Sequence, residues 1–356
     1  MEHIKKIEIN NFKSIRHAEI KDCRRINVFI GYPNVGKSNI LEALGLFSIE
    51  DPFTSFSSFI RMDNFPTIFF DGNIQDRLEV KLNDNQRFIG KIIDGSLKFE
   101  RQYASDATLF EDIEFITPLN DSSITLKKRF KLKDNKTIID FEGPNFTEMK
   151  FGHIIPDILK YEFKKDYTPN ETVFTSLQHP NGNNIFSILY TNQVLKKQAA
   201  DILNQYGLEL LYDSRNQNFT ILKRTNTGIF TVPYELLADT IQRLFFYKAA
   251  ILSNQGVVLL FEEPEAHMFP PYISKLTSDM MFDKNNNQFF ITTHSPYVLN
   301  DFMEELKDDE LAVYLVSYKK ETVETVIDKM SKEEMHEAYQ FGYDFFLNME
   351  NFIPTN

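Results

Sequence analysis

A short glycine-containing segment near the N-terminus constrains this chain more than any other part of its sequence. Residues 31–38 read Gly-Tyr-Pro-Asn-Val-Gly-Lys-Ser, with an alternating apolar run over 26–30 before them and helically spaced apolar residues after them. The alternation predicts a strand, and the later spacing predicts a helix. A glycine loop between a strand and a helix is the context in which backbone N–H groups surround a phosphate. The sequence therefore predicts an α/β fold with a phosphate site at this loop.

The positions of the loop have separate physical roles. The Lys37 ammonium would reach the β and γ phosphates of a nucleotide, and the Ser38 hydroxyl would hold Mg2+. The glycines leave room for the phosphate, and Asn34, at a position often held by glycine, tolerates a positive φ better than most residues. The predicted nucleotide-binding residues are Gly31, Asn34, Gly36, Lys37, Ser38 and Asn39.

The loop by itself fits a GTPase as well as an ATPase, and the rest of the chain favours ATP. A guanine site needs Asn-Lys-x-Asp, because the carboxylate pairs with the N1 and N2 donors of the base. Residues 135–138 read Asn-Lys-Thr-Ile and lack that carboxylate. The predicted cofactors are therefore ATP and Mg2+.

Two adjacent carboxylates follow an apolar run far along the chain. The continuous apolar run 257–261 is typical of a buried parallel strand, and Glu262 and Glu263 come directly after it. At the carboxyl end of a core strand, one acid can hold Mg2+ and the next can activate water. A solvated acidic turn is the alternative interpretation. A second run, 288–292, leads to His294, interpreted as a γ-phosphate sensor with a structural histidine as the alternative.

The other segments are expected to surround this core. Short strands punctuated by turns predict an inserted antiparallel sheet, with runs at 77–82, 88–93, 97–101, 124–132 and 137–141. One helix is predicted to end at Gly207 and another to run over 233–253, and Ser331 with Glu334 forms a capping box for a last helix. The expected division is a nucleotide core at 1–65 and 254–330, a β insert at 66–150, a helical lobe at 151–253 and a tail at 331–356.

Charge and composition limit the partners. The 356 residues include 51 Asp and Glu against 39 Lys and Arg, for a formal net charge of -12. A protein that binds by neutralising many phosphates is not expected with this balance, so any nucleic-acid contact is predicted to be local. Lys127, Lys128 and Arg129 are the candidate contact, and the solvated face of an edge strand is the alternative.

The same composition indicates the compartment. Cys23 is the single cysteine, so an internal disulfide is excluded, and the apolar runs are far shorter than a membrane helix requires. The first ten residues carry charges throughout and lack the apolar region of a secretion signal. A cytoplasmic protein with no membrane partner is expected.

The three parts together resemble the ABC-type ATPase heads of the structural-maintenance-of-chromosomes and RecF-like group. The strongest resemblance is to the ATPase domain of the overcoming-lysogenization-defect (OLD) family and its stand-alone relatives in bacterial defence operons, over residues 7–15, 26–44 and about 235–299. The resemblance implies an ABC-type head with a Walker A motif at 31–38. It also implies that Glu262 is the acid that binds Mg2+, that Glu263 is the general base and that His294 is the switch histidine, which senses the γ-phosphate.

The resemblance further implies a head-to-tail homodimer, in which a Ser-x-Gly signature of one subunit closes over the γ-phosphate bound to the other. Ala238 and Thr240 stand at the Ser and Gly positions here, with Asp239 between them. Loss of the hydroxyl and a blocked backbone approach predict slow hydrolysis or a mainly structural ATP, although the helix N-terminus still offers N–H groups to an anion. Arg243 is a candidate substitute contact in trans, with an ordinary surface arginine as the alternative.

The leading hypothesis is an ATPase that dimerises and serves as sensor or scaffold for a separate effector in anti-phage defence. Complete OLD-type enzymes carry a Toprim nuclease after the ATPase, and the segment beyond His294 is too short for one. A nuclease on another polypeptide is therefore the expected partner. The alternative is a DNA-repair or chromosome-associated clamp that acts directly on DNA, and a transporter ATPase is a weaker third hypothesis.

Overall fold

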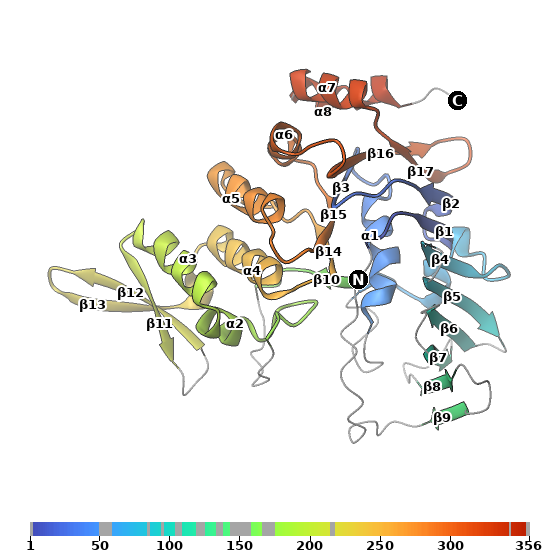
Figure 1. Cartoon of the computed structure of the whole chain (residues 1–356), viewed down its shortest axis with the longest axis horizontal. Helices are drawn as coiled ribbons and strands as arrows, with labels where there is room; N and C mark the ends of the chain where they lie inside the picture. Colours follow the sequence, from blue (N-terminus) through green and yellow to red (C-terminus); the bar gives the residue numbers. More distant parts are fainter. Residues whose placement is uncertain are drawn as a thin grey trace.

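The computed structural model describes residues 3–49, 59–83, 86–93, 96–103, 109–118, 125–132, 138–142, 158–165, 175–213, 218–341 and 343–353. The strands in these ranges form three sheets, which Figure 1 shows with helices between and around them. None of the helices in the same ranges has the length and apolar character needed to span a lipid bilayer.

The central sheet carries the phosphate loop. Its strands are β3 (Ile26–Ile30), β10 (Ile158–Tyr161), β14 (Val258–Glu262), β15 (Gln288–Thr292), β16 (Leu311–Lys319) and β17 (Glu324–Lys329). Their order is β10-β14-β15-β3-β16-β17, and every neighbouring pair is parallel except the last. The inner strands β14, β15, β3 and β16 are largely apolar and buried because both faces of this sheet are covered, whereas the edge strand β17 is mostly polar.

A larger antiparallel sheet lies beside the core (Figure 1). Its strands, in spatial order, are β2 (Ile15–Ile20), β1 (Ile7–Phe12), β4 (Leu78–Leu82), β5 (Gln86–Ile93), β6 (Ser96–Tyr103), β7 (Leu109–Pro118), β8 (Thr125–Leu132) and β9 (Ile138–Glu142). Five of them match the predicted strands of the β insert. Strand β7 was not predicted, because Glu111, Asp112 and Glu114 interrupt its apolar residues with types that are rare in strands.

The helices and a small third sheet complete the described fold. The helices are α1 (Lys37–Gly45), α2 (Ile185–Thr191), α3 (Gln193–Asn204), α4 (Asp239–Ser253), α5 (Pro270–Met281), α6 (Pro296–Glu305), α7 (Lys332–Phe341) and α8 (Tyr343–Leu347). The third sheet, in the order β11 (Leu208–Asp213), β12 (Asn218–Thr225) and β13 (Gly228–Pro233), projects at the far end of the molecule from the large sheet (Figure 1). The predicted α/β class with an inserted antiparallel sheet and a helical part is confirmed.

Two hydrophobic cores lie on opposite faces of the central sheet. Alternate residues of each strand enter one core or the other, as β14 illustrates with Leu259 and Phe261 on one face and Val258 and Leu260 on the other. Helix α1 packs on the second of these faces, between the central and the large sheet, whereas α4 and α5 cover the first. The sheet therefore separates α1 from α4.

Several local predictions have a direct outcome. Gly207 has the predicted left-handed φ, at 67°, but helix α3 ends earlier than predicted, at Asn204. The capping box is confirmed, because the Ser331 N–H donates to Glu334 Oε2 at 2.6 Å and the Glu334 N–H donates to Ser331 Oγ at 3.2 Å. The helix predicted from residue 233 instead begins at Asp239, since β13 runs to Pro233 and a 3-10 turn follows it.

Strand pairing crosses two of the expected boundaries between parts. Strands β1 and β2 lie in the segment assigned to the nucleotide core but join the large sheet, with Ile7 paired to Leu82 of β4. Strand β10 lies in the segment assigned to the helical lobe but pairs with β14 in the central sheet. Neither pairing has a local sequence signal, because both depend on contacts between distant parts of the chain.

Candidate functional site

The phosphate loop has the backbone that its sequence predicts. It joins the C-terminal end of β3 to α1, and Asn34 has a φ of 62°, in the left-handed region where asparagine is tolerated. Gly36 has a φ of 101°. A Cβ atom on Gly36 would lie 2.2 Å from Thr325 Oγ1 and 2.6 Å from Ser14 Oγ, so only glycine fits there. The loop thus packs against Ser14, in the turn after β1, and against Thr325 of strand β17.

Lys37 lies inside this loop. Its Nζ donates to the carbonyl oxygens of Gly31 at 2.9 Å and Tyr32 at 2.8 Å, and the residue is 5% exposed. Burial lowers the pKa of the Lys37 ammonium to about 8, and the nearby Glu263 and Glu262 carboxylates act in the opposite direction. Lys37 is therefore a cation held by weak carbonyl partners, which phosphate oxygens can replace with stronger charge-assisted bonds.

The two predicted acids lie at the carboxyl end of β14, which β15 separates from β3. Glu262 is the last residue of β14 and pairs in register with Thr292 of β15, which in turn neighbours β3 and its phosphate loop. Glu263 follows with a φ of 42°, and its N–H donates to the Thr292 carbonyl at 3.0 Å. This left-handed turn ends the strand, and strained backbone of this kind often occurs at functional sites.

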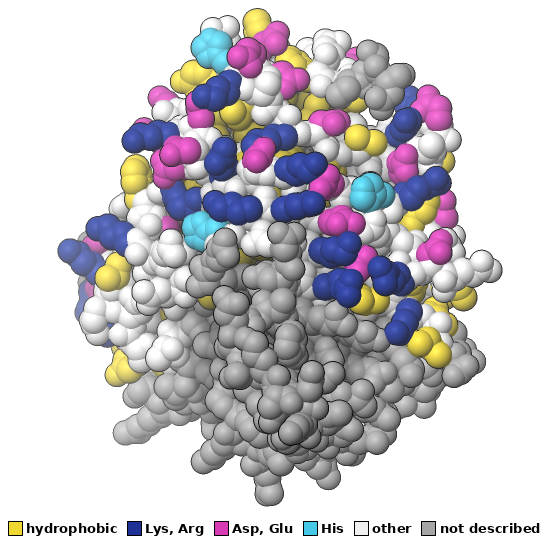
Figure 2. Space-filling view, turned by 45° about the vertical axis from the view of Figure 1, so that its right-hand side comes forward, with side chains coloured by type: hydrophobic (Ala, Val, Ile, Leu, Met, Phe, Trp, Pro, Cys, Tyr) yellow, Lys and Arg dark blue, Asp and Glu magenta, His cyan; other side chains and the backbone are white. Residues whose placement is uncertain are grey.

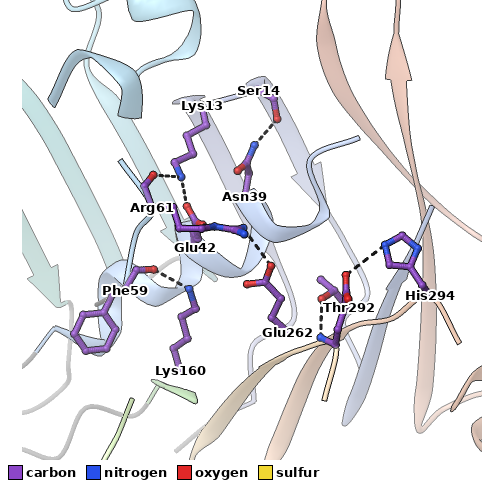
Figure 3. A network of polar contacts seen from close by, with 11 residues as sticks. Lys13, Ser14, Asn39, Glu42, Phe59, Arg61, Lys160, Glu262, Thr292 and His294 are labelled. Atoms are coloured by element: carbon purple, nitrogen blue, oxygen red, sulfur yellow. Dashed lines mark hydrogen bonds and ion pairs between the residues drawn. The ribbon is translucent and has the colours of Figure 1, made fainter. Parts of the chain in front are cut away.

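His294 completes this cluster from the end of β15. Its Nε2 lies 3.4 Å from Glu263 Oε1, and Figure 3 shows the imidazole facing the end of β14. Burial and the Lys37 charge lower the pKa of His294, against the opposing effect of Glu263. A neutral imidazole at neutral pH suits a hydrogen-bonding role toward a phosphate or a water. The structure therefore brings Lys37, both glutamates and His294 to one edge of the central sheet.

The donor set at this edge suits Mg2+ bound together with a nucleotide. The described ranges hold no group of three or more His, Cys, Asp or Glu residues that would bind a metal alone. Mg2+ is usually held by only one or two protein oxygens, with waters and phosphates as its other ligands. Ser38 in the first turn of α1 and Glu262 provide hydroxyl and carboxylate oxygens of this kind. These two residues would hold Mg2+.

Asn39 has a different environment from the rest of the loop. Its side-chain amide donates to Ser14 Oγ at 2.7 Å, and Ser14 Oγ lies 2.7 Å from Thr325 Oγ1. Thr325 Oγ1 also donates to the Val35 carbonyl at 2.8 Å. In this structure Asn39 belongs to the network that supports the loop.

A third carboxylate, which sequence reasoning missed, lies beneath the cluster. Glu265 is 8% exposed, and its Oε1 accepts from Thr293 Oγ1 at 2.5 Å and from the His294 N–H at 3.3 Å. Its Oε2 is buried and has no hydrogen-bond partner within the described ranges. Glu265 therefore ties the loop after β14 to the loop after β15, and so links the positions of Glu263 and His294.

The burial of Glu265 predicts a pH dependence of stability. Burial raises the pKa of Glu265 from 4.5 to about 7, so between these values the native state binds more protons than the unfolded state and stability falls as pH rises. We expect Glu265→Gln to remove this pH-dependent loss. Relative to the wild type, its free energy of unfolding should therefore rise by about 1–3 kcal/mol when the pH goes from 5 to 8. Urea unfolding of the variant and the wild type at both pH values measures this difference in the free energy of unfolding. The exposed Glu304→Gln is the control, and a pH-independent difference for Glu265→Gln would contradict the prediction.

The predicted signature residues stand at the start of α4. Ala238 precedes the helix without a side-chain cap, and Thr240 Oγ1 donates to the His267 carbonyl at 2.6 Å. Arg243 Nε lies 2.8 Å from Asp239 Oδ2, its guanidinium lies 4.8 Å from the Phe163 ring centroid, and its side chain is only 19% exposed.

These contacts change the interpretation of Arg243. It is not an ordinary surface arginine, because Asp239 and Phe163 hold it within its own chain. Helix α4 also packs on the face of the central sheet opposite to α1, the helix that follows the phosphate loop. A contact with nucleotide in trans stays a prediction for Ala238, Asp239, Thr240 and Arg243.

Comparison with known protein families assigns the chain. A family model described as "AAA domain, putative AbiEii toxin, Type IV TA system" matches residues 26–300, which is more than half of the chain. The chain belongs to this family. It therefore carries a P-loop ATPase domain, and the match includes the phosphate loop, Glu262, Glu263 and His294.

Relatives of this AAA-domain protein cover different shares of it. An uncharacterized protein of Methanocaldococcus jannaschii is 28% identical over 218 residues, which are 53% of this chain and 62% of that protein. The chain thus spans less than two thirds of the length of that relative. A Helicobacter pylori protein named ATP/GTP phosphatase is 20% identical over 347 residues, 87% of this chain and 90% of its own.

The solved structures similar to this AAA-domain chain include SMC heads. A head bound to the C-winged helix domain of ScpA has a TM-score of 0.48 at 13% identity, with 94% of this chain and 100% of that chain covered. The head domain from Thermotoga maritima has a TM-score of 0.41 at 14% identity, with 93% and 100% covered.

Several residues around the AAA-domain site were missed by sequence reasoning. They are Lys13, Ser14, Glu42, Arg61, Glu265 and Thr325. A signal was present for Glu42, an acid within the otherwise apolar run Ile40 to Leu44 of α1, where a buried charge demands a partner. Arg61 and Thr325 have no such local pattern, since only tertiary contacts bring them to the loop.

Proposed function

We propose that this protein is a Mg2+-dependent ATPase whose site lies between the phosphate loop and the ends of β14 and β15. The observation that carries the proposal is the convergence of Lys37, Glu262, Glu263 and His294 at one edge of the sheet. Lys37 would bind the β and γ phosphates, and Ser38 with Glu262 would hold Mg2+. When bound, Mg2+ neutralises phosphate charge and orients the transferring group.

Glu263 and His294 are proposed to act on the attacking water. Glu263 is 43% exposed at its side chain, so its carboxylate is open to water and can accept a proton as general base. His294, 3.4 Å away, would orient this carboxylate or hydrogen-bond the γ-phosphate. Glu265 fixes the spacing of the two through the Thr293 hydroxyl and the His294 N–H.

Phosphate release tests the proposed activity and its nucleotide preference. We expect Mg2+-dependent release from ATP that exceeds release from GTP, since Asn-Lys-Thr-Ile lacks the carboxylate that reads guanine; its residues 135–137 lie outside the described ranges. The measurement compares both nucleotides with and without EDTA. Equal release with EDTA would contradict the metal requirement, and faster release from GTP would contradict the preference.

We further propose that ATP binding drives a head-to-tail homodimer that acts as sensor or scaffold for a separate effector in anti-phage defence. The family description, which names a toxin of a toxin–antitoxin system, and the OLD-like motifs support a defence context. A nuclease is the proposed effector class. Co-purification of a tagged chain from its native cells tests this, because a nuclease retained with the protein supports the scaffold.

The structure gives less support to the alternative of a clamp acting directly on DNA. Strand β8, which holds Lys127 and Arg129, lies between β7 and β9, so the expectation of an edge strand is wrong. The backbone register pairs Lys127 with Glu114 of β7 and with Glu142 of β9. Two further lysines of the same basic stretch, Lys133 and Lys136, lie outside the described ranges.

The described part of the large sheet shows the same mixture of charges. Figure 2, which brings this sheet forward, shows acidic and basic side chains interspersed. The Glu79 carboxylate forms ion pairs with Arg77 Nη2 at 3.3 Å and with Arg87 Nη1 at 3.2 Å. Lys81 Nζ lies 3.2 Å from Glu8 Oε1. The cations named here are thus paired with acids, which favours a protein partner over DNA.

A further inference from the structure

A buried carboxylate beside the proposed site holds two cations. Glu42 of α1 is fully buried, and it forms ion pairs with Lys13 on one side and with Arg61 Nε, at 2.7 Å, on the other. Lys13 Nζ also donates to the Arg61 carbonyl at 2.6 Å. Figure 3 shows the Arg61 side chain extending from Glu42 toward Glu262 at the end of β14.

The same arginine contacts Glu262, the acid that is proposed to bind Mg2+. Arg61 Nη2 lies 3.1 Å from Glu262 Oε1, so one guanidinium joins a carboxylate of α1 to the carboxylate that ends β14. The side chain of Arg61 is 65% exposed and that of Glu262 is 25% exposed, whereas Glu42 is at 0%. The Arg61–Glu262 pair is therefore the outer, solvent-facing part of the network and can separate without exposing any of the core.

Mg2+ and the guanidinium compete for the same atoms. A carboxylate oxygen that accepts from Arg61 has fewer lone pairs for a metal or for a metal-bound water, and two cations next to one carboxylate repel each other. The Glu42 carboxylate keeps hold of Arg61 Nε at the buried end, so the arginine stays tethered when its outer contact is lost. The contact of Arg61 with Glu42 is thus fixed, whereas its contact with Glu262 can be exchanged for another ligand.

We propose that Arg61 is a positioning residue that holds Glu262 until Mg2+ bound with nucleotide displaces it, and that it thereby sets the Mg2+ concentration required for nucleotide binding. This inference rests on the proposed function, because it needs a nucleotide in the phosphate loop. Removal of Arg61 does not leave the buried Glu42 without a cation, since Lys13 remains paired with it. Arg61→Gln is therefore expected to fold.

The test is a binding measurement that requires no turnover. A fluorescent ATP analogue is titrated into the full chain at a series of free Mg2+ concentrations, and the Mg2+ concentration that gives half of the affinity gain is compared between variants. We expect Arg61→Gln to lower this concentration about two- to fivefold, the scale of a partly exposed ion pair. Arg61→Lys, which keeps the charge but cannot hold two carboxylates with one fork, should lie between wild type and Arg61→Gln.

A matched control distinguishes this role from loss of a surface charge. Arg224 is 61% exposed and pairs with Glu209 at 2.7 Å in the third sheet, and Arg224→Gln should leave the Mg2+ dependence unchanged. An unchanged or higher half-saturating Mg2+ concentration in Arg61→Gln would overturn the inference while wild-type binding still supports the proposed function. Absence of saturable binding in wild type would overturn both.

Discussion

Lys37→Ala is expected to reduce the affinity for ATP by about 100-fold or more, because each hydrogen bond from a charged donor contributes about 1.5–3 kcal/mol and this ammonium would make at least two. The ammonium lies inside the loop and 5% exposed, so no other described cation is placed to replace it there. Isothermal titration calorimetry with ATP and Mg2+ measures the effect.

Two comparisons keep this result interpretable. Lys21→Ala removes a lysine that is 62% exposed and paired with Glu19, so it should bind ATP as wild type does. Lys37 also donates to the Gly31 and Tyr32 carbonyls, so the thermal unfolding midpoint of each variant is recorded to confirm that the loop substitution leaves the fold intact. Retention of micromolar ATP affinity by a folded Lys37→Ala protein would remove the assignment of this loop as the nucleotide site.

Glu263→Gln is expected to lower the rate of ATP hydrolysis by about 10²- to 10⁴-fold while ATP binding is retained, the usual contribution of a general base. Glutamine keeps the size of the side chain but cannot accept the proton of the attacking water. Since ATP then stays bound, the variant should also accumulate as the ATP-bound dimer. Single-turnover hydrolysis and light scattering after gel filtration with Mg2+ and ATP measure the two effects.

The outcomes separate the roles of the two neighbouring acids. The exposed Glu337→Gln in α7 should hydrolyse ATP as wild type does. Unchanged turnover in Glu263→Gln would exclude it as the base, and loss of ATP affinity in that variant would assign it to Mg2+ instead. A variant that retains ATP yet stays monomeric would contradict the proposed dimer and leave the assignment of the base intact.

The predicted site residues came together for a reason that is visible in sequence. Residues at the carboxyl ends of parallel strands meet at one edge of a sheet, so Glu262 and His294 could be assigned to the neighbourhood of the phosphate loop before any contact was known. The conformations of Asn34 and Gly36 and the Ser331–Glu334 cap were predictable for the same local reason, because each depends on a few consecutive residues.

The supporting residues were not predictable in this way. Glu42 is paired with Lys13, 29 positions before it, and Arg61 reaches Glu262 across 201 positions. Glu265 has no local pattern that marks a role, and only its burial next to Thr293 and His294 shows that it joins two loops.

Local chemistry was therefore enough to place a nucleotide loop, its acids and the α/β class, since backbone conformation and strand-end position follow from short runs of residue types. Tertiary structure alone decided that β1 and β2 belong to the large sheet, that α1 and α4 lie on opposite faces of the core, and that Arg61 bridges Glu42 and Glu262. The physical reason is that charged and polar side chains choose partners by distance in the folded chain, and that distance is set by the packing of segments far apart in sequence.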